Sequence, residues 1–346
     1  MHPKKLRSSR KYFHLKALRE KTMRFKPSKI LITGGAGFIG SHLVDRLMMD
    51  GQKVTVFDNL SNGSLKNLQR WLENESFRFI KGDLKKPSDV EEAVKDIELV
   101  FHLAANPEVR VGETDPSIHF QENLAATFNL LEVMKKSASA KIFVFFSTST
   151  VYGEVEILPT SEDYGPSIPI STYGASKLGC EALASSYAHT FGLRTLILRI
   201  ANVVGPRANH GVIIDFINKL ETDPKRLEIL GDGTQKKSYL HIEDFIDATL
   251  HLTSRFLDDK KKVDVYNVGS VDQVEVEKIA EIVAEEMDLQ HVKFVFTGGV
   301  DGGRGWLGDV KIMLLSIDKL MKTGWKPKYN SEQAVRLAVK AFLKER

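Results

Sequence analysis

Two side chains near the middle of the chain have the chemistry and spacing of a proton-transfer pair. Tyr173 and Lys177 are four residues apart at the start of a helix-patterned stretch, so they share one helix face. A free tyrosine has a pKa near ~10 and is protonated at neutral pH. Because a neighbouring ammonium favours the phenolate, we expect Lys177 to lower the pKa of Tyr173 and make it a base for a hydroxyl proton.

A run of hydroxyl residues, STST at 147–150, follows an apolar stretch that is typical of a buried strand. Hydroxyls at the carboxyl end of a strand are placed to contact a bound sugar. Since Tyr-x-x-x-Lys is a common spacing by chance, this neighbouring feature strengthens its interpretation as a catalytic pair.

The third feature is a glycine-rich turn, TGGAGFIG at residues 33–40, between the apolar run at 30–32 and a helix-patterned stretch. The wide spacing Gly34-x-x-Gly37-x-x-Gly40 lets the backbone approach a ligand closely, and the first amides of the helix point at it. A strand that ends at such a turn and opens a helix predicts a nucleotide site.

An acid at the end of the next strand indicates which nucleotide. Asp58 lies 18 residues after Gly40 and closes the apolar run at 54–57. A carboxylate there accepts hydrogen bonds from ribose hydroxyls and repels a 2′-phosphate, which favours NAD over NADP. With NAD⁺ bound, its positive nicotinamide would add to Lys177 in lowering the pKa of Tyr173. Tyr173 would then take a proton while hydride leaves the same carbon for the cofactor.

Alternating strand and helix signals predict how these residues are positioned. The pattern from residue 29 onward is that of an α/β protein with a doubly wound, Rossmann-type parallel sheet. We expect a basic N-terminal tail at 1–28, an NAD-binding domain with the catalytic residues at 29–204, and mainly a smaller substrate lobe at 205–346. The predicted strands are 29–33, 53–57, 77–80, 98–103, 141–147 and 194–200, and the predicted helices lie near 39–50, 63–74, 87–95, 117–136 and 173–191.

Two further strand ends belong to the predicted site. Asp83, in the segment KGDL at 81–84, either reaches the adenine amino group or caps a turn. The next strand ends in FHLAA at 101–105, whose small residues allow a ribose or diphosphate to lie against it. His102, inside that strand, is interpreted as a satisfied core histidine.

Composition narrows the class of protein. The single cysteine, Cys180, excludes an internal disulfide, fits a reducing compartment such as the cytoplasm, and is expected to be buried. No apolar run reaches the ~20 residues that span a membrane, and we predict no metal site.

Residues 1–29 contain eleven Lys or Arg and one acid, which leaves 38 basic and 44 acidic residues in the remainder. This tail is a targeting leader, a nucleic-acid or membrane arm, or an accessory segment with Met23 near the natural start.

Together these motifs resemble the extended short-chain dehydrogenase/reductase family, and within it the NAD-dependent nucleotide-sugar epimerases and dehydratases. The resemblance covers about residues 29–346. The similar segments are 33–40, 58–63, 101–105, 147–153, 173–177, 198–207, 231–241 and 305–310.

The resemblance implies roles for individual residues. Thr148, Tyr173 and Lys177 would be catalytic, with Thr148 on the sugar hydroxyl and Lys177 also on the nicotinamide ribose. Asn202 and Thr148 would contact the substrate, and Lys236 or Lys237, together with Arg304, would neutralise its diphosphate. Many relatives carry arginine in the 235–238 stretch, and either lysine is also readily explained as surface charge. The implied cofactor residues are Gly34, Gly37, Phe38, Ile39, Gly40, Asp58, Asn59, Leu60, Ser61, Asn62, Gly63, Asp83, Leu84, Leu103, Ala104, Ala105, Asn123, Tyr173 and Lys177.

The reaction is argued from residues 149 and 150. Similar dehydratases place Asp-Glu there, because elimination of water needs an extra acid and base, and similar decarboxylases keep the Glu. Ser149 and Thr150 cannot act as carboxylates. We therefore expect a 4-epimerase, and residues 58–63 and 147–153 look most like those of enzymes that interconvert UDP-glucose and UDP-galactose.

Several alternatives stay open at this point. UDP-glucuronate or a UDP-N-acetylhexosamine could be the substrate, and Met313 either gates the N-acetyl group or is simply core. A one-way reductase and a non-catalytic NAD-binding scaffold are the other functions considered. The resemblance also implies a homodimer paired through the helices near 117–136 and 173–191, and neither a membrane nor a nucleic acid is the expected partner.

Overall fold

A computed structural model describes residues 29–345, and the predicted basic tail at 1–28 lies outside the described residues. Its centre is a seven-stranded sheet in the order β11-β6-β5-β4-β1-β2-β3, with every neighbouring pair parallel. The doubly wound α/β class predicted from the sequence is confirmed. The strands are β1 Lys29–Thr33, β2 Lys53–Asp58, β3 Phe77–Lys81, β4 Leu99–His102, β5 Ile142–Thr148, β6 Arg194–Ile200 and β11 Val263–Val268.

The strand order places the site. The chain runs outward from β1 to β3 and then returns to the other side of β1 as β4. Ligands bind at such a reversal point, in the crevice outside the carboxyl ends of the strands. The glycine turn follows β1 and Asp58 ends β2, so both lie at this edge.

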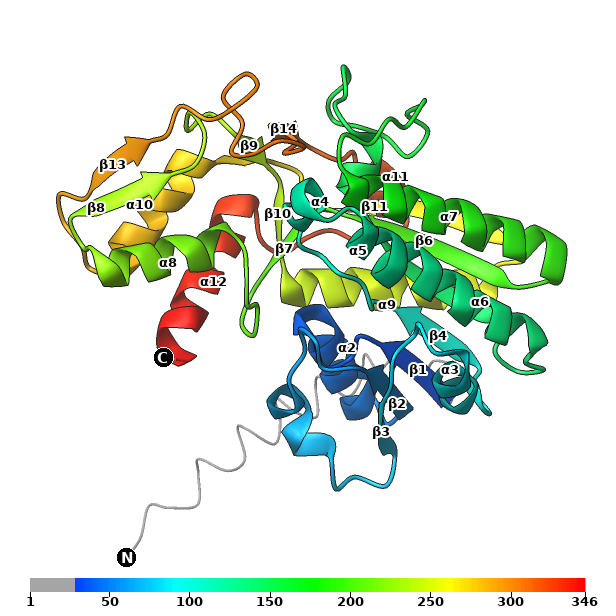
Figure 1. The fold of residues 1–346 in the computed structure, drawn as a ribbon. Coiled ribbons are helices and arrows are strands. Elements are labelled where there is room, and N and C mark those ends of the chain that lie inside the picture. Colours follow the sequence, from blue (N-terminus) through cyan, green and yellow to red (C-terminus); the bar gives the residue numbers. More distant parts are fainter. Residues whose placement is uncertain (1–28, 346) are drawn as a thin grey trace, which may run out of the picture.

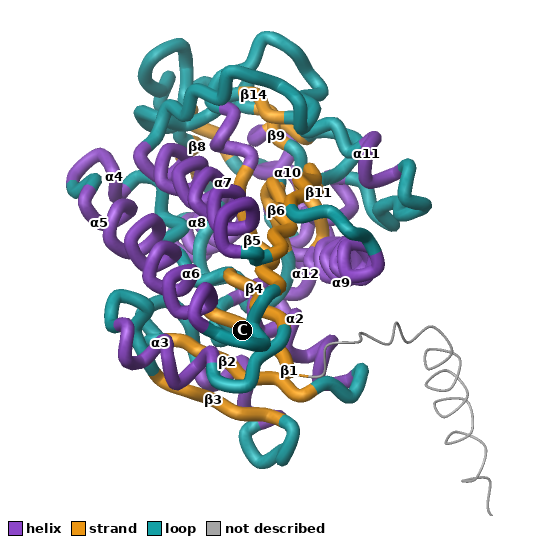
Figure 2. The backbone as a smooth tube through the Cα atoms, turned by 90° about the vertical axis from the view of Figure 1, so that its right-hand side faces the viewer, coloured by secondary structure: helices purple, strands orange, loops and turns teal. Residues whose placement is uncertain are grey.

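Helices cover both faces of the sheet, because its central strands are apolar on both sides. Figure 2 shows α2 and α9 on one face and α3, α6 and α7 on the other. None of the helices in the described part of the chain has the length and apolar character needed to cross a bilayer. The covering helices are α2 Phe38–Met49, α3 Pro87–Val94, α6 Ala126–Lys136, α7 Thr172–Phe191 and α9 Ile242–Asp258.

Shorter turns complete this part of the fold. The region predicted as one helix at 117–136 is a short helix, a π-helical turn and then α6, and the region predicted at 63–74 is mainly a 3₁₀ turn. Their bounds are α4 Val111–Thr114, α5 Ser117–His119, the π turn Phe120–Ala125, and 3₁₀ turns Leu65–Trp71 and Ser149–Tyr152.

A second lobe lies beside the carboxyl edge of the sheet (Figure 1). It has its own core, in which α8, α10 and α12 pack with β8 and β13. Two small sheets, β7–β10 and β12–β9–β14, join it to the large one. Its elements are β7 Asn202–Val204, α8 Val212–Thr222, β8 Arg226–Ile229, β9 Lys236–Lys237, β10 Tyr239–His241, β12 Val274–Glu275, α10 Val276–Glu286, β13 Lys293–Phe296, β14 Ile312–Met313 and α12 Ser331–Glu345.

The chain returns to the large sheet after entering the second lobe. Helix α9 and strand β11 come from residues beyond 205 yet cover and extend the Rossmann sheet, and α11 Asp318–Met321 packs beside β11. The segments that form the two lobes therefore alternate along the sequence. This is possible because a strand at the edge of a sheet can come from any segment that returns to that edge.

Gly40 provides a stability test of the nucleotide turn. A Cβ on Gly40 would lie 2.2 Å from the Gly34 carbonyl oxygen, so Gly40→Ala should force the turn apart. We expect a loss of at least about 2 kcal/mol in the free energy of unfolding, in the range of other severe steric changes, together with weaker NAD binding. Chemical denaturation and NAD titration measure the two effects.

Gly51 supplies the matched control at the other end of α2. Its φ is +78° but a Cβ there meets no atom within 4 Å. Gly51→Ala should cost about 1–2 kcal/mol through backbone strain alone and leave NAD affinity unchanged. Equal effects of the two substitutions on NAD affinity would show that the tight turn does not shape the nucleotide site.

Candidate functional site

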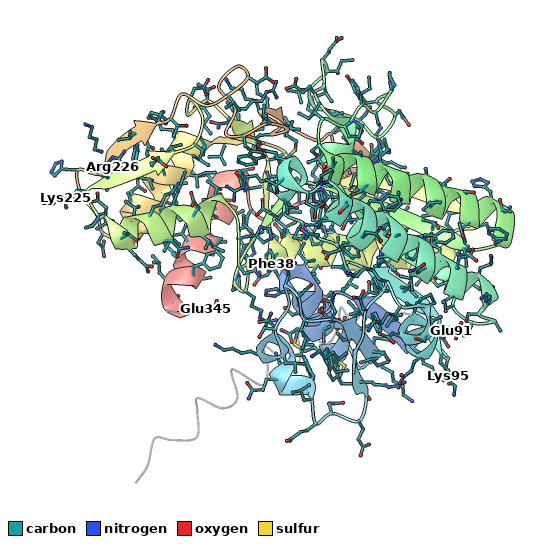
Figure 3. All side chains as sticks on the ribbon, viewed as in Figure 1. Phe38, Glu91, Lys95, Lys225, Arg226 and Glu345 are labelled. Carbon is teal, nitrogen blue, oxygen red and sulfur yellow. The ribbon has the colours of Figure 1, made fainter. Side chains whose placement is uncertain are left out.

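A cavity of about 940 Å³ lies where the carboxyl edge of the sheet faces the second lobe. Its walls come from the ends of β1, β2, β4, β5 and β6 and from α8 and the β9 region. In Figure 3 the labelled Phe38, at the start of α2, lies between the two lobes, whereas Lys225 and Arg226 mark the outer end of the second lobe. The cavity therefore joins the predicted nucleotide turn to the predicted substrate lobe.

The glycine turn is shaped for close approach to an anion. Gly34 has a φ of +71°, and its amide donates to the Phe57 carbonyl at 2.9 Å. Gly37 precedes α2 without any side-chain cap, so the first amides of the helix keep their hydrogen-bonding capacity. Such a helix start favours a phosphate group. This geometry fits a dinucleotide and is the feature that the glycine spacing predicts.

Asp58 is held at the end of β2 by two backbone amides. Its carboxylate oxygens accept from Ala36 at 2.9 Å and from Leu60 at 2.8 Å. Burial raises the pKa of Asp58, and the two amide bonds oppose that shift. Each oxygen retains a further lone pair for a ribose hydroxyl. Leu60 itself does not line the cavity but adopts a φ of +63° that brings its amide to Asp58.

The structure shows one of the two roles that the sequence left open for Asp83, the turn cap, while a contact with adenine stays a prediction. The side chain caps a turn by accepting from the Lys85 amide at 2.9 Å, and the residue also lines the cavity. His102 is fully buried between Thr33 and Thr127, with its ring nitrogens 2.7 and 2.9 Å from the two hydroxyls. Burial lowers the pKa of His102 to about 3, so its interpretation as a neutral core residue is confirmed.

Thr148, Tyr173 and Lys177 meet at one end of the cavity. Thr148 ends β5 and its side chain hydrogen-bonds Tyr173, which is the second residue of α7. Lys177 is one turn further along α7, is only 3% exposed, and places Nζ 4.6 Å from the Phe145 ring centroid. All three predicted catalytic residues line the cavity. The structure thus brings together the hydroxyl, the phenol and the ammonium.

Burial governs the protonation of Tyr173 and Lys177 in the protein without its cofactor. Burial raises the pKa of Tyr173 to about 12, and the hydrogen bond from Thr148 opposes that rise only in part. Burial also lowers the pKa of Lys177 to about 8. Without the cofactor, desolvation of the phenolate is therefore the larger effect, and the expectation that Lys177 and NAD⁺ together lower the pKa of Tyr173 stays a prediction. The positive nicotinamide of NAD⁺ supplies the further charge that favours the phenolate when the cofactor is bound.

The side chains of Lys236 and Lys237 point to opposite sides of β9, because successive side chains of a strand alternate between its two faces. Lys237 lines the cavity and pairs with Asp309, which is 3% exposed. Lys236 lies on the other side, outside the cavity wall, and pairs with Glu275 at 3.3 Å. Asn202, at the start of β7, also lines the cavity. The structure therefore brings Lys237 and Asn202 to the site but not Lys236.

Two other predicted residues support the wall and do not form it. Arg304 pairs with Glu154 and Asp301 and donates to the Asp309 carbonyl at 2.9 Å. Asn123 is buried in the π-helical turn, where it accepts from the Asn106 amide at 2.7 Å. Neither is a lining residue.

Most of the remaining predicted cofactor residues lie in the wall. These residues follow four different strands, so no single stretch of the sequence shows that they share one wall. The lining residues among them are Gly34, Gly37, Phe38, Ile39, Gly40, Asn59, Ser61, Asn62, Gly63, Leu84, Leu103, Ala104 and Ala105.

Two residues in the wall were not predicted from the sequence. Trp306 lies between two cations, with the Arg110 guanidinium 5.6 Å and the Lys237 ammonium 5.5 Å from its ring centroid. The only signal in the sequence is a tryptophan inside a glycine-rich stretch. Arg110 follows the small residues after β4, but nothing in its local pattern separates it from a surface arginine.

The fold and this wall define a nucleotide-binding oxidoreductase-like class: a Rossmann sheet whose carboxyl edge carries a Thr–Tyr–Lys trio. The profile of the NAD dependent epimerase/dehydratase family matches residues 30–269. The chain belongs to that family, and NAD is its cofactor.

Three relatives illustrate the range of chemistry in the family. A crystal structure of a UDP-galactose 4-epimerase is 44% identical, covers 92% of this chain and 99% of its own, and superposes with a TM-score of 0.82. A UDP-glucuronic acid 4-epimerase from Bacillus cereus, in complex with UDP-glucuronic acid and NAD, is 31% identical, covers 92% of this chain and 100% of its own, and has a TM-score of 0.81. UDP-glucuronic acid decarboxylase 1 of Danio rerio is 28% identical over 97% of this chain and 77% of its own length.

Lys177→Met should stabilise the cofactor-free protein at pH 7, because it removes a buried cation. A fall in the pKa of Lys177 from 10.5 to about 8 corresponds to about 3 kcal/mol. The folded protein releases this proton near pH 8 and the unfolded chain near 10.5. The destabilisation by Lys177 is therefore complete below pH 8 and disappears as the pH rises towards 10.5.

Urea unfolding at pH 7 and pH 10 measures this effect. The advantage of Lys177→Met should be large at pH 7 and small at pH 10. Lys236→Met is the control, since Lys236 is exposed beside Glu275 and should give no gain at either pH. A Lys177→Met variant that is less stable than the parent at pH 7 would contradict this account.

Proposed function

We propose that the protein is a 4-epimerase of UDP-hexoses that interconverts UDP-glucose and UDP-galactose. The observation that carries the proposal is the carboxyl end of β5. There Thr148 bonds to Tyr173, while the next two wall positions are Ser149 and Thr150. Oxidation at a carbinol carbon needs only the trio, whereas elimination of water needs a further acid and base that hydroxyls do not provide.

The proposed reaction assigns one task to each side chain. Thr148 hydrogen-bonds the C4 hydroxyl, and Tyr173 takes its proton. Lys177 binds the nicotinamide ribose and favours the phenolate of Tyr173. NAD⁺, held by the glycine turn and Asp58, would supply the acceptor and donor of the C4 hydride. After the 4-keto sugar has turned about its diphosphate link, hydride would return to the opposite face of C4 while Tyr173 gives the proton back to the C4 oxygen.

The second lobe would hold the nucleotide diphosphate. Lys237 is a cation that the second lobe contributes to the wall, and Asn202 lies on β7 of the same cavity. Because Lys237 is an ammonium and not a guanidinium, it acts as a point charge without the paired geometry of arginine. Arg110 is another cation of the wall and also lies near the Trp306 ring.

We also propose a homodimer that pairs through the α5–α6 region and α7. Phe120 and Phe128 leave large apolar surfaces in contact with solvent on the first of these segments, and Phe191 does so at the end of α7. Exposed aromatic residues on adjacent helices are the chemistry expected of such an interface.

The reaction is tested by following anomeric protons by NMR in a mixture of UDP-galactose, the protein and catalytic NAD. We expect conversion to UDP-glucose without net NADH, and Tyr173→Phe should lower kcat by at least about 100-fold, the range for loss of an acid–base group. UDP-glucuronate and UDP-N-acetylglucosamine serve as parallel substrates. If the protein converts only one of these two compounds, that compound is its substrate. Stoichiometric consumption of NADH would instead identify a reductase.

A matched pair of lysine variants tests the diphosphate contact. Lys237→Ala should weaken UDP binding by about tenfold or more, since a charge-assisted hydrogen bond contributes about 1.5–3 kcal/mol. Lys236→Ala, one residue away on the outer side of β9, should change the affinity by less than about twofold. Calorimetric titration with UDP measures both, and thermal unfolding of each variant checks the fold. If Lys237→Ala and Lys236→Ala weaken UDP binding equally, the position of Lys237 in the cavity wall does not contribute to that binding.

A further inference from the structure

We propose that His119 is a positioning residue that fixes Tyr173 and one wall of the cavity relative to each other. His119 is the last residue of α5, and none of the expected catalytic or binding roles uses it. The kinetic part of this inference rests on the proposed epimerase function, whereas its structural part does not.

The ring of His119 bridges two segments that are distant in sequence. Its Nδ1 lies 2.8 Å from the Thr172 hydroxyl, and its Nε2 lies 3.1 Å from the Glu108 carbonyl oxygen. The ring is fully buried and meets the ring of Tyr173 edge-on, with the centroids 5.6 Å apart and the planes at 63°. One side chain therefore contacts the proposed base, the residue before it and the cavity wall.

The two hydrogen bonds determine which nitrogen of His119 carries the proton. A backbone carbonyl only accepts, so Nε2 must donate to Glu108. In the neutral ring Nδ1 then accepts, and the Thr172 hydroxyl donates to it. Burial lowers the pKa of His119, which keeps the ring in this neutral form near pH 7. The bridge is therefore directional and orients both partners.

Close packing at Gly112 shows how tightly this bridge is enclosed. A Cβ on Gly112 would lie 2.1 Å from the Thr172 hydroxyl oxygen and 3.0 Å from His119 Nδ1. Only a residue without a side chain leaves room for the bond between His119 and Thr172. The start of α4, which carries Gly112, thus closes the bridge from a third side.

The bridge acts on both ends of the proposed site. Residues 106–111 all line the cavity, and the Glu108 carboxylate accepts from the Arg110 amide and guanidinium, each at 3.2 Å. Arg110 in turn lies over Trp306, on the far side of the cavity wall. His119 therefore sets the distance between the proposed proton acceptor Tyr173 and the wall segment at 106–111.

The test compares His119→Phe, Thr172→Val and the double variant in the NAD-loaded protein. Phenylalanine keeps the ring contact with Tyr173 and removes both hydrogen bonds, whereas valine removes only one of them. Each single variant should lower kcat for UDP-galactose by about tenfold while KM stays within about threefold, because proton transfer depends on position more than on affinity. The double variant should be no slower than His119→Phe. His189→Phe, at an exposed histidine on α7, is the control and should leave both constants unchanged.

Hydrogen exchange provides a readout that does not depend on the substrate. Amides of 106–111 should exchange at least about tenfold faster in both single variants, while those of β5 keep the parental rate. If His119→Phe does not fold, Thr172→Val tests the same bond from its more exposed partner. If the parent converts no UDP sugar, the proposed function fails and the exchange measurement alone decides the bridge. Parental exchange at 106–111, or parental kcat in an active enzyme, would overturn the inference.

Discussion

The site depends on keeping a charged lysine where burial opposes its charge. Lys177 remains at the carboxyl edge because α7 is fixed on the sheet by Cys180 and Ala184, which are both fully buried. Glu181, one turn after Lys177, accepts a bidentate bond from Arg199 at the end of β6 and another from Ser147 of β5. This buried network holds the same helix turn in place, so Lys177 and Tyr173 keep their positions even though desolvation shifts the pKa of each group away from the charged form.

The parallel sheet brings Lys177 and Tyr173 together with the other residues of a cavity that would bind both cofactor and substrate. The carboxyl ends of parallel strands lie at one edge, which brings the glycine turn, Asp58 and Thr148 to a common wall. The second lobe is attached at the same edge and adds Lys237 and Trp306. Cofactor residues therefore come from the centre of the sheet and the proposed substrate residues from its far side and the lobe, with Tyr173 between them.

The sequence predicts those parts of the site that depend on local spacing. The turn at 33–40, the acid after β2 and the pair on α7 each follow from residues close together in the chain. Contacts between distant segments could not be predicted in this way. Arg304 is drawn to Glu154, and Lys236 faces Glu275, because the register of β9 and the length of the 298–308 segment decide which cation reaches the cavity. The pKa of Tyr173 depends on how completely the folded protein excludes water. Strand β11 reaches the sheet only after the chain has entered the second lobe, and the chain then returns to that lobe.

The proposed reaction requires hydride to leave and return to one sugar carbon within the same cavity. Its most direct test is the conversion of UDP-galactose that carries deuterium at C4, in ordinary water with catalytic NAD, with the product examined by NMR and mass spectrometry. We predict UDP-glucose that retains the deuterium at C4 at every turnover, with no labelled NADH released. Loss of the label to solvent, or accumulation of labelled NADH, would contradict this account of the cavity.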